Sequence, residues 1–512
     1  METSELSNRR RKLKKTLKPS WVFAIALGSS VGWGAFILPG DWIRESGPLG
    51  AMIGLFIGAL LMMVIASSYG VMIKKFPVSG GGFTYAFIAA GKVWAFICGW
   101  FLSLGYLSIV ALNASAFTLL LKFLAPDFMN RYYLYSVAGW DVYAPEIIIA
   151  SALILLFAFI NTTGTSLSGR IQFYFSLILI GGVVILGLFT LGVADQPFQN
   201  LKPYFSGKQS ILTSILVIVA IAPWAYVGFD NVPQAAEEFN FSPRKATMLI
   251  VASLFTSALI YAIMIGLTAW TFPDLSAIGQ GNLWLTGDIV VSALGAGGLI
   301  VMAIAIIMGI FTGLNGFYMS ASRLLFSMAR ARALPNVFRT ITKEKQTPIW
   351  GIWFVALITL PMPWFGRQAL SWIVDMSSTG VSVAYLFTCL AAYKVVAWKQ
   401  EDAGREIAPV KKALALIGIM ASSAFLALLL IPVSPAALSM PSYILLLAWT
   451  VIGGVFYASM RKRYNSLSQE ETELYVLGKT IASEVMDAQE SSLPDTKKPS
   501  IGMDGLPAKQ IT

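Results

Sequence analysis

The chain has 512 residues, of which 56% are hydrophobic and 12% charged, with a mean hydropathy of +0.71. Soluble domains carry about 25% charged residues, so this composition excludes a soluble fold. There is no histidine, and both cysteines, Cys98 and Cys389, fall within apolar stretches. A disulfide framework, a zinc site and a histidine proton relay are therefore not expected. We expect no metal and no cofactor.

Apolar stretches of roughly 20 residues, the length that crosses a ~30 Å hydrocarbon core, recur along the chain. They predict an all-α integral membrane protein with about twelve spans. The expected spans are residues 20–40, 48–72, 93–121, 145–162, 171–194, 211–236, 247–271, 289–322, 348–365, 369–393, 413–432 and 441–460. The signal is weakest before Asn161 and around Pro361. An even number of spans places both termini on one side of the membrane.

The formal net charge of +11 is explained by topology. If the N-terminus is cytoplasmic, 31 of the 37 Lys and Arg residues lie on the inner side of the expected spans. The six on the outer side are Arg44, Lys122, Arg131, Lys202, Lys208 and Arg367. This asymmetry follows the positive-inside rule and predicts a plasma or inner membrane protein with both termini in the cytoplasm. The basic charge therefore does not indicate a nucleic-acid partner; the expected surroundings are the lipid bilayer.

Two expected spans carry residues that a plain lipid-facing helix avoids. The first contains Gly28, Gly32 and Gly34 among small hydroxyls, and the sixth contains Pro223 and Gly228. Gly28 and Gly32 alone fit a close-packing motif, and Pro223 alone fits a kink. Interruptions at the starts of two five-span halves, however, are the pattern of an inverted-repeat transporter with a midplane site. We expect a tail at 1–19, a ten-helix core at 20–398, two accessory helices at 399–460 and a C-terminal tail at 461–512.

The C-terminal tail carries no recognisable function. Residues 466–490 could form a short amphipathic helix, and the Pro, Lys and Ser content beyond Ser491 predicts disorder.

An unwound first span exposes backbone N–H groups and the positive end of a half-helix, which suit a carboxylate. An unwound sixth span exposes carbonyl groups, which suit an ammonium. One site would thus bind both ends of a zwitterion, while aromatic residues shape its variable part or simply pack in the core. Two acidic residues within the spans, Asp230 and Asp375, are candidates for proton coupling, so a proton is a candidate partner. The alternative for each is a helix cap or a paired structural carboxylate.

Several segments resemble the amino acid, polyamine and organocation (APC) superfamily of secondary transporters. They are GSSVGWGAFILPG from Gly28, FPVSGGGFTYAF from Phe76, NTTG from Asn161, WAYVGFD from Trp224 and NGFYMSASRLLFSMARARALP from Asn315. The match covers about residues 21–394, and the occurrence of five motifs in order supports the resemblance. It implies a LeuT-like core of five plus five inverted helices with broken first and sixth helices.

The resemblance also implies a set of site residues. Amides near Ser30, Gly32, Trp33 and Gly34 would bind a carboxylate, and carbonyls near Trp224, Ala225 and Val227 an amine. Further substrate-binding candidates are Ser29, Tyr226 and Gly228. Trp224 would act as an aromatic gate and Phe317 as a stacking ring, while Ser103 and Tyr106 would touch the side-chain pocket. Leu179 stands where the cationic-amino-acid branch carries a lysine, which weakens a lysine-dependent proton mechanism. Trp33 replaces a small residue and would narrow the pocket.

The expected function is transport of an amino acid or related amine by alternating access, through proton symport or exchange. An alternative is a membrane sensor that binds amino acids without transporting them. An enzyme is disfavoured by the lack of a clustered nucleophile and base, and an ATP-driven pump by the lack of a GxxxxGK[ST] loop. No acidic side-chain pocket beyond Asp230 is evident, which favours a neutral amino acid. The oligomeric state is left open.

Overall fold

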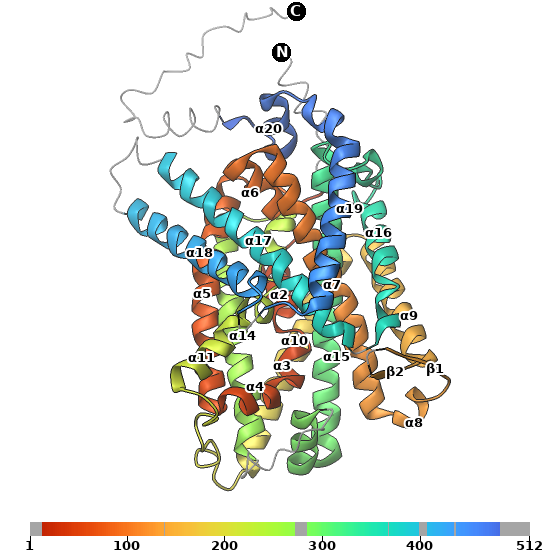
Figure 1. The fold of residues 1–512 in the computed structure, drawn as a ribbon, viewed down its shortest axis with the longest axis vertical. Coiled ribbons are helices and arrows are strands. Elements are labelled where there is room, and N and C mark those ends of the chain that lie inside the picture. The colour runs from red at the N-terminus through yellow and green to blue at the C-terminus, as the bar shows by residue number, and fades with distance from the viewer. Residues whose placement is uncertain are drawn as a thin grey trace, which may run out of the picture.

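The computed structural model of the protein describes residues 13–137, 139–271, 284–366, 368–398, 407–434 and 437–481. The basic residues Arg9 to Lys12, Arg367 and the tail beyond residue 481 lie outside these ranges. Within them nine helices are long and apolar enough to cross a membrane, which confirms the all-α membrane class (Figure 1). They are α5 (Pro48–Lys75), α7 (Lys92–Leu124), α9 (Ala144–Thr162), α10 (Thr165–Val193), α14 (Arg244–Trp270), α15 (Leu285–Arg330), α17 (Gln368–Trp398), α18 (Ile407–Leu430) and α19 (Met440–Asn465).

The other three expected spans are divided into shorter pieces. The first consists of α2 (Pro19–Val31), α3 (Gly34–Ile37) and α4 (Pro39–Ser46). The sixth consists of α11 (Ile211–Ala220), α12 (Ala222–Ala225), α13 (Asn231–Gln234) and the 3-10 turn η1 (Ala236–Glu238). The ninth consists of α16 (Ile349–Thr359) and η4 (Met362–Phe365). Because none of these pieces alone reaches the length of a span, the count of twelve stays a prediction.

The long helices extend beyond the sequence estimates. α15 has 46 residues against the expected 289–322, and its one non-helical residue is Gly295 (φ 63°, ψ −158°). α7 has 33 residues and contains no proline that would interrupt its hydrogen bonds. α5 begins at Pro48, whose missing N–H is tolerated in a first turn, and ends at Lys74 and Lys75, which favour the negative helix terminus.

A small β-hairpin departs from a purely helical fold. β1 (Tyr133–Val137) pairs antiparallel with β2 (Trp140–Tyr143), next to the short helix α8 (Pro126–Met129). The Tyr135 hydroxyl donates to the backbone oxygen of Trp364 at 2.7 Å, which fixes the hairpin against the end of η4. The segment is polar and aromatic and lies between two spans, so hydropathy gave no signal for strands.

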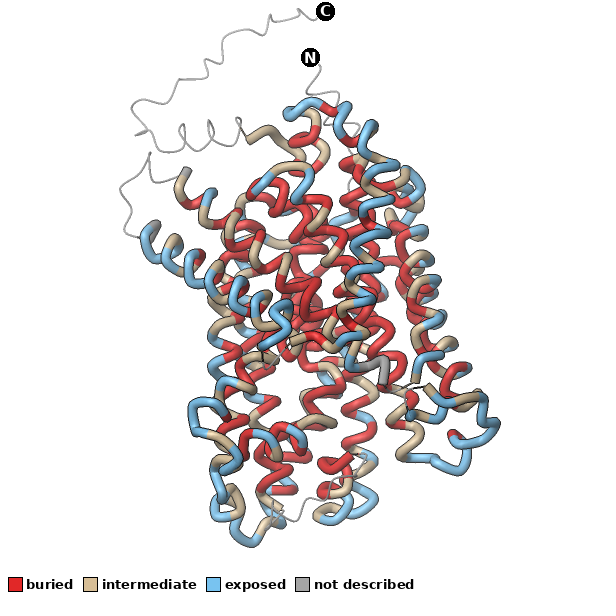
Figure 2. The backbone as a smooth tube through the Cα atoms, in the orientation of Figure 1, coloured by how far each residue is buried: buried red, intermediate tan, exposed pale blue. Residues whose placement is uncertain are grey.

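The core is built around α7, which packs against α15 and α17, while α10 packs against α15 and α14 against α5. Figure 2 shows α7 as largely buried and α18 and α19 as largely exposed. α19 is held to α7 by the stacked rings of Trp100 and Trp449, 4.7 Å apart. Each of these indoles donates to the backbone oxygen of the other residue, at 2.9 and 3.1 Å.

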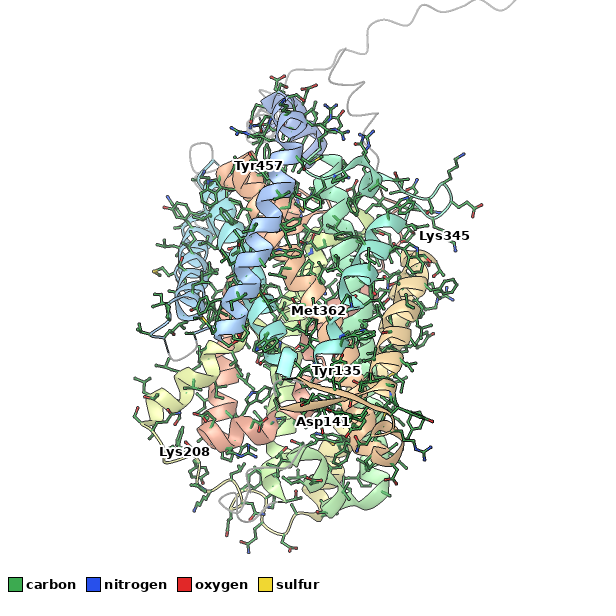
Figure 3. The ribbon with its side chains drawn as sticks, turned by 45° about the vertical axis from the view of Figure 1, so that its right-hand side comes forward. Tyr135, Asp141, Lys208, Lys345, Met362 and Tyr457 are labelled. Atoms are coloured by element: carbon green, nitrogen blue, oxygen red, sulfur yellow. The ribbon has the colours of Figure 1, made fainter. Side chains whose placement is uncertain are left out.

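One end of the helix bundle carries α6 (Gly81–Ala90) and α20 (Gln469–Leu477), and the other carries the hairpin and α4 (Figure 1). We name these the inner and outer ends, following the positive-inside prediction. η3 (Asn336–Arg339) follows α15. α20 starts with a capping box between Ser468 and Glu471 and has its C-cap at Gly478. Residues 482–490 of the expected helix at 466–490 lie outside the described ranges. Lys345 lies toward the inner end, and Lys208 and Asp141 lie toward the outer end (Figure 3).

This orientation can be tested with single cysteines, because the native Cys98 and Cys389 are fully buried. We expect Lys208→Cys to react with a membrane-impermeant maleimide on intact cells, since its side chain is exposed at the outer end. Lys345→Cys should react only after permeabilisation, and the parent protein should stay unlabelled. Labelling of Lys345→Cys on intact cells would show that the orientation is wrong.

Candidate functional site between two broken helices

The first break separates α2 from α3. α2 ends at Val31, and Gly32 follows with φ 51° and ψ −161°, a conformation that a residue with a Cβ rarely adopts. Trp33 then precedes Gly34, the first residue of α3. The expected interruption at Gly32 is therefore present. The interruption leaves the carbonyl groups at the end of α2 and the amide groups at the start of α3 outside a continuous helical ladder.

The second break lies between α12 and α13. Pro223 stands in the first turn of α12, which ends at Ala225, and residues 226–230 form turns before Asn231. Gly228 has φ 126°. A Cβ at Gly228 would lie 2.5 Å from the carbonyl carbon of Ser29, so only glycine lets the two breaks touch at this point.

Two hydroxyl groups join the breaks. Ser30 Oγ donates to the backbone oxygen of Tyr226 at 3.2 Å. The Tyr261 hydroxyl, from α14, lies 2.6 Å from the oxygen of Ala225 and 3.1 and 3.4 Å from those of Ser30 and Val31. One hydroxyl proton serves one acceptor at a time, so these three carbonyl groups share a single donor. Tyr261 was not among the residues predicted from the sequence. It could have been recognised as a residue with a polar hydroxyl in the middle of an apolar span.

Polar side chains on α10 and α15 anchor the inner half of the first span. Gln172 Nε2 and Ser176 Oγ donate to the backbone oxygen of Ala24, at 3.3 and 3.1 Å. Thr312 Oγ1 donates to the oxygen of Gly28 at 2.8 Å. The broken span is therefore stabilised by side chains of α10 and α15 as well as by its own backbone hydrogen bonds.

A cavity of about 30 Å³ lies between the breaks. It is lined by residues 29–34, by Ile109, Leu112 and Asn113 of α7, and by Trp224, Ala225, Val227 and Tyr261. A second cavity of about 530 Å³ extends toward the outer end and is lined by α3, α4, α7, β2, and the starts of α15 and α17. Trp33 and Trp224 line both cavities, with ring centres 6.2 Å apart in an edge-to-face arrangement. The two indoles therefore lie at the boundary between the cavities.

The structure brings eight of the sequence-predicted site residues to the smaller cavity: Ser29, Ser30, Gly32, Trp33, Gly34, Trp224, Ala225 and Val227. Five others lie elsewhere. Ser103 Oγ donates within its own helix to the oxygen of Trp100 at 2.7 Å. Tyr226 donates away from the cavity to the oxygen of Leu55 at 2.8 Å, and Gly228 contacts the backbone of Ser29.

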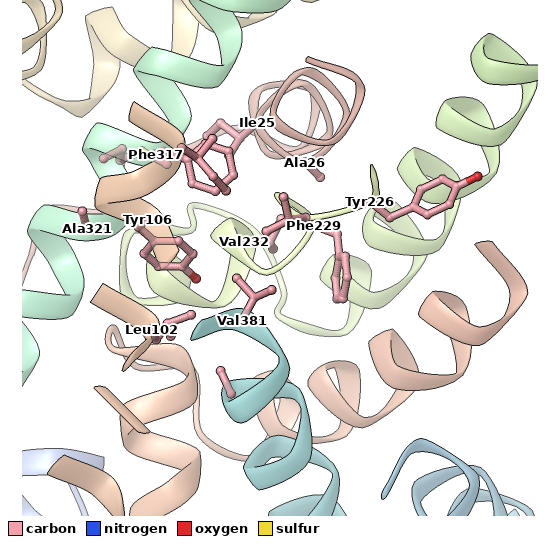
Figure 4. Packing of buried hydrophobic residues seen from close by; sticks show 14 of the residues in the cluster. Ile25, Ala26, Leu102, Tyr106, Tyr226, Phe229, Val232, Phe317, Ala321 and Val381 are labelled. Carbon is pink, nitrogen blue, oxygen red and sulfur yellow. The ribbon is translucent and has the colours of Figure 1, made fainter. Parts of the chain in front are cut away.

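The remaining two, Tyr106 and Phe317, pack against each other with ring centres 5.6 Å apart. Figure 4 shows both rings within the buried cluster, on a different side of the second break from the ring of Tyr226. In this conformation the Phe317 ring is tilted by 52° against the Tyr106 ring and is fully buried.

Asp230 is fully buried beside the second break. Its Oδ2 accepts from the Tyr106 hydroxyl at 2.7 Å, and its Oδ1 accepts from the N–H of Gly228 at 2.9 Å. The Tyr106 oxygen in turn accepts from Gln234 Nε2 at 3.1 Å. The carboxylate therefore fixes the turn at Gly228 to α7, and it does not line either cavity.

Asp375, the second proton-coupling candidate, lies on α17 and contacts the start of α19. Its Oδ2 accepts from the Ser442 hydroxyl at 2.6 Å and from the N–H of Ser439 at 3.3 Å. It also lines the larger cavity. A carboxylate at a helix N-terminus is stabilised by the helix dipole, so this position matches the helix-cap alternative.

The inner end is closed by two buried ion pairs. Glu238 pairs with Arg323 at 2.7 Å, and Glu237 pairs with Arg330 at 2.9 Å. Thr165 donates to Glu238 as well. The N-terminal segment contacts the same region, because the backbone N–H of Leu17 donates to the backbone oxygen of Glu238 at 2.9 Å. The sequence analysis did not single out this inner network, because its charged residues were assigned to loops.

Within the described ranges, no group of three or more Cys, Asp or Glu residues has the geometry of a metal site. The polar atoms of the smaller cavity are backbone groups and uncharged side chains. Such a lining can bind a small polar molecule by hydrogen bonds and helix-end partial charges.

Broken apolar helices around a central cavity define a multi-pass membrane protein of the transporter class. A profile of the amino acid permease family matches residues 17–456, so the chain belongs to this family and functions in amino acid transport. The resemblance to the APC superfamily is thereby confirmed. An enzymatic role is not a property of this family.

Three relatives illustrate the range of the family. The methylthioribose transporter of Bacillus subtilis is 23% identical, with 75% of this chain and 84% of the relative aligned. Two proteins of Lactococcus lactis follow: the branched-chain amino acid permease BcaP is 26% identical (73% of this chain, 80% of the relative) and the lysine-specific permease LysP 25% (70% of each).

The contact between the breaks yields a stability prediction. Gly228→Ala should destabilise the protein by about 1–3 kcal/mol or more, because the new Cβ meets the Ser29 backbone and the positive φ becomes strained. Thermal unfolding of the purified protein in detergent measures the loss. The matched control is Gly181→Ala, where a Cβ has no neighbour within 4 Å and helix propensity improves. Equal melting temperatures for the two variants would contradict the close contact.

Proposed function

We propose that the protein is a secondary active transporter that carries an amino acid or related amine by alternating access. The observation that carries the proposal is the cavity enclosed by two helix breaks, with a larger outer cavity on one side and a buried ion-pair network on the other. Alternating access needs a central site that connects to one side at a time. In this proposal the conformation is outward-facing, and Trp33 and Trp224 cover the site.

The proposed architecture has twelve spans, of which the first ten form the five-plus-five inverted repeat. The breaks at Gly32 and Gly228 support equivalent positions for the first and sixth spans. In this proposal residues 1–19 and 461–512 are cytoplasmic tails, 20–398 form the transport core and 399–460 the accessory helices. The location is the plasma membrane or the bacterial inner membrane, with both termini in the cytoplasm.

The substrate would bind through its two charged ends. Amide groups around Gly32, Trp33 and Gly34 would bind the carboxylate at the start of α3. Carbonyl groups around Trp224, Ala225 and Val227 would bind the ammonium. The oxygen of Ala225 accepts from Tyr261 in the present conformation, so an arriving ammonium would replace that hydroxyl as its donor. Relatives named as permeases of branched-chain amino acids and lysine support a zwitterionic substrate.

Two coupling schemes are compatible with the site: proton symport and amino-acid exchange. Leu179 is buried where a coupling lysine would stand, so a lysine cannot supply the charge. Asp230 is then the better candidate, because it fixes the second break to α7 through Tyr106. Protonation there would weaken the contact to Gly228 and could thus change the break.

The glycines of the first break supply a transport prediction. Gly34→Val should abolish uptake into proteoliposomes, because a Cβ at Gly34 lies 2.7 Å from the Trp224 ring. Gly32→Val should do the same through the positive φ of Gly32. The control is Gly192→Val on α10, where a Cβ has no neighbour within 4 Å. Uptake equal to the parent's in both site variants would overturn the assignment, and ligand binding without accumulation in the parent would instead indicate the sensor alternative.

The coupling candidate leads to a pH experiment. Asp230→Asn keeps the shape and the bond to Gly228 but removes a titratable carboxylate. We expect the pH dependence of initial uptake rates to flatten in the variant if Asp230 carries the coupling proton. Asp375→Asn is the comparison, since that carboxylate binds the start of α19. Parallel pH profiles for Asp230→Asn and the parent would remove Asp230 from the mechanism and favour exchange.

A further inference from the structure

Besides the two helix breaks, α7 lines the smaller cavity, but with other residues than those predicted from the sequence. Ser103 and Tyr106 were expected to form the side-chain pocket, but α7 contributes Ile109, Leu112 and Asn113 to the cavity. If the breaks bind the carboxylate and the ammonium, these α7 residues are left to contact the substrate's side chain. The inference below therefore rests on the proposed function and adds a substrate class to it.

Asn113 presents a free hydrogen-bond acceptor. The residue is 3% exposed, and its Nδ2 donates to the oxygen of Ile109 at 2.8 Å. A backbone carbonyl only accepts, so the NH₂ group must face Ile109 and the amide oxygen must face away from it. Oδ1 has no hydrogen-bond partner among the described residues. A buried acceptor without a donor is unfavourable, and a ligand that supplies the donor gains affinity.

The backbone of α15 limits how the amide can turn. A Cβ at Gly313 would lie 2.7 Å from both Nδ2 and Oδ1 of Asn113, so the amide packs directly against this glycine. A larger residue at position 313 would displace it. The acceptor is thus held in place by the Ile109 carbonyl on one side and by Gly313 on another.

Several of the other side chains that line the smaller cavity are apolar and of moderate size. Ile109, Leu112, Val31 and Val227 line the same cavity as Asn113, and no charged side chain lines it among the residues that the structure describes. The hydroxyl of Ser29, 6% exposed, is a second polar group of the lining without a hydrogen-bond partner among the described residues. A long or charged side chain finds no matching group here, whereas a short side chain with one donor satisfies Asn113.

We infer that Asn113 determines specificity, and that the substrate is a short amino acid whose side chain carries a hydroxyl group, as in serine or threonine. The hydroxyl donates to Asn113 Oδ1, and the methyl or methylene groups pack on Ile109 and Leu112. Valine has the shape of threonine but cannot donate, so it leaves the acceptor buried and unsatisfied. Alanine relates to serine in the same way.

The test compares these isosteric pairs on the full-length protein. Dissociation constants for L-threonine, L-valine, L-serine and L-alanine are measured by ligand-induced thermal shift, and uptake of each by proteoliposome assay. We expect the parent to bind threonine about tenfold or more tightly than valine, the effect of one satisfied hydrogen bond. Asn113→Leu, similar in shape but without an acceptor, should bring the threonine-to-valine ratio to about one or below.

Thr118→Val is the matched control on the same helix. The Thr118 hydroxyl donates to the oxygen of Ser115 and lies outside the cavity lining, so the ratio should stay at the parent's value. An unchanged ratio in Asn113→Leu, with both ligands weakened equally, would show that Asn113 binds the common amino-acid group and would overturn the inference. A parent that does not prefer threonine overturns it even if the variant fails to fold. Uptake of valine without preference would leave the transporter proposal intact, whereas no uptake of any amino acid would refute both.

Discussion

The central constraint on this structure is that backbone groups freed within a membrane must find partners inside the protein. Each helix break releases carbonyl and amide groups at a depth where lipid offers no hydrogen bonds. Side chains from neighbouring helices supply partners: Thr312 and Gln172 donate to the first span, and Tyr261 contacts both breaks. Ser30 of the first span itself donates to the second break. The groups that remain available then face the cavity. The backbone groups that have no partner elsewhere in the protein are therefore gathered between the two breaks, where they can bind a ligand.

The large features were predictable from the sequence because they follow from composition and backbone chemistry. Long apolar stretches define the helices, and Gly32, Gly228 and Pro223 mark where two of them are interrupted. The breaks also position Trp33 and Trp224, since both flank glycine or proline in the chain. Eight predicted site residues consequently line the cavity. The hairpin at residues 133–143 was not predictable from hydropathy, which reports on membrane spans and is silent on short polar strands.

What the sequence could not supply was the rotation and depth of each helix. Ser103 and Asn113 are both small polar residues in one apolar helix, and nothing local distinguishes which lies beside the breaks. The packing of α7 determines which of the two lines the cavity. Ser103 donates a hydrogen bond within its own helix, whereas the Asn113 amide packs against Gly313 of α15. The same holds for Tyr261, because its partners lie 36 to 231 residues away along the chain. The inner ion pairs similarly join residues that hydropathy places in separate loops.

The pairing of Leu17 with the segment around Phe239 has a consequence for how the inner end can open. The backbone of Leu17 and the carboxylate of Glu238 are held by one short stretch of chain, so moving η1 disturbs a strand-like contact and an ion pair together. Partial opening would leave buried charges without partners, which is strongly unfavourable. Opening should thus be cooperative, with few intermediate states. For a carrier, this suppresses leakage, because solute cannot slip through a half-open inner end while the outer cavity is still accessible.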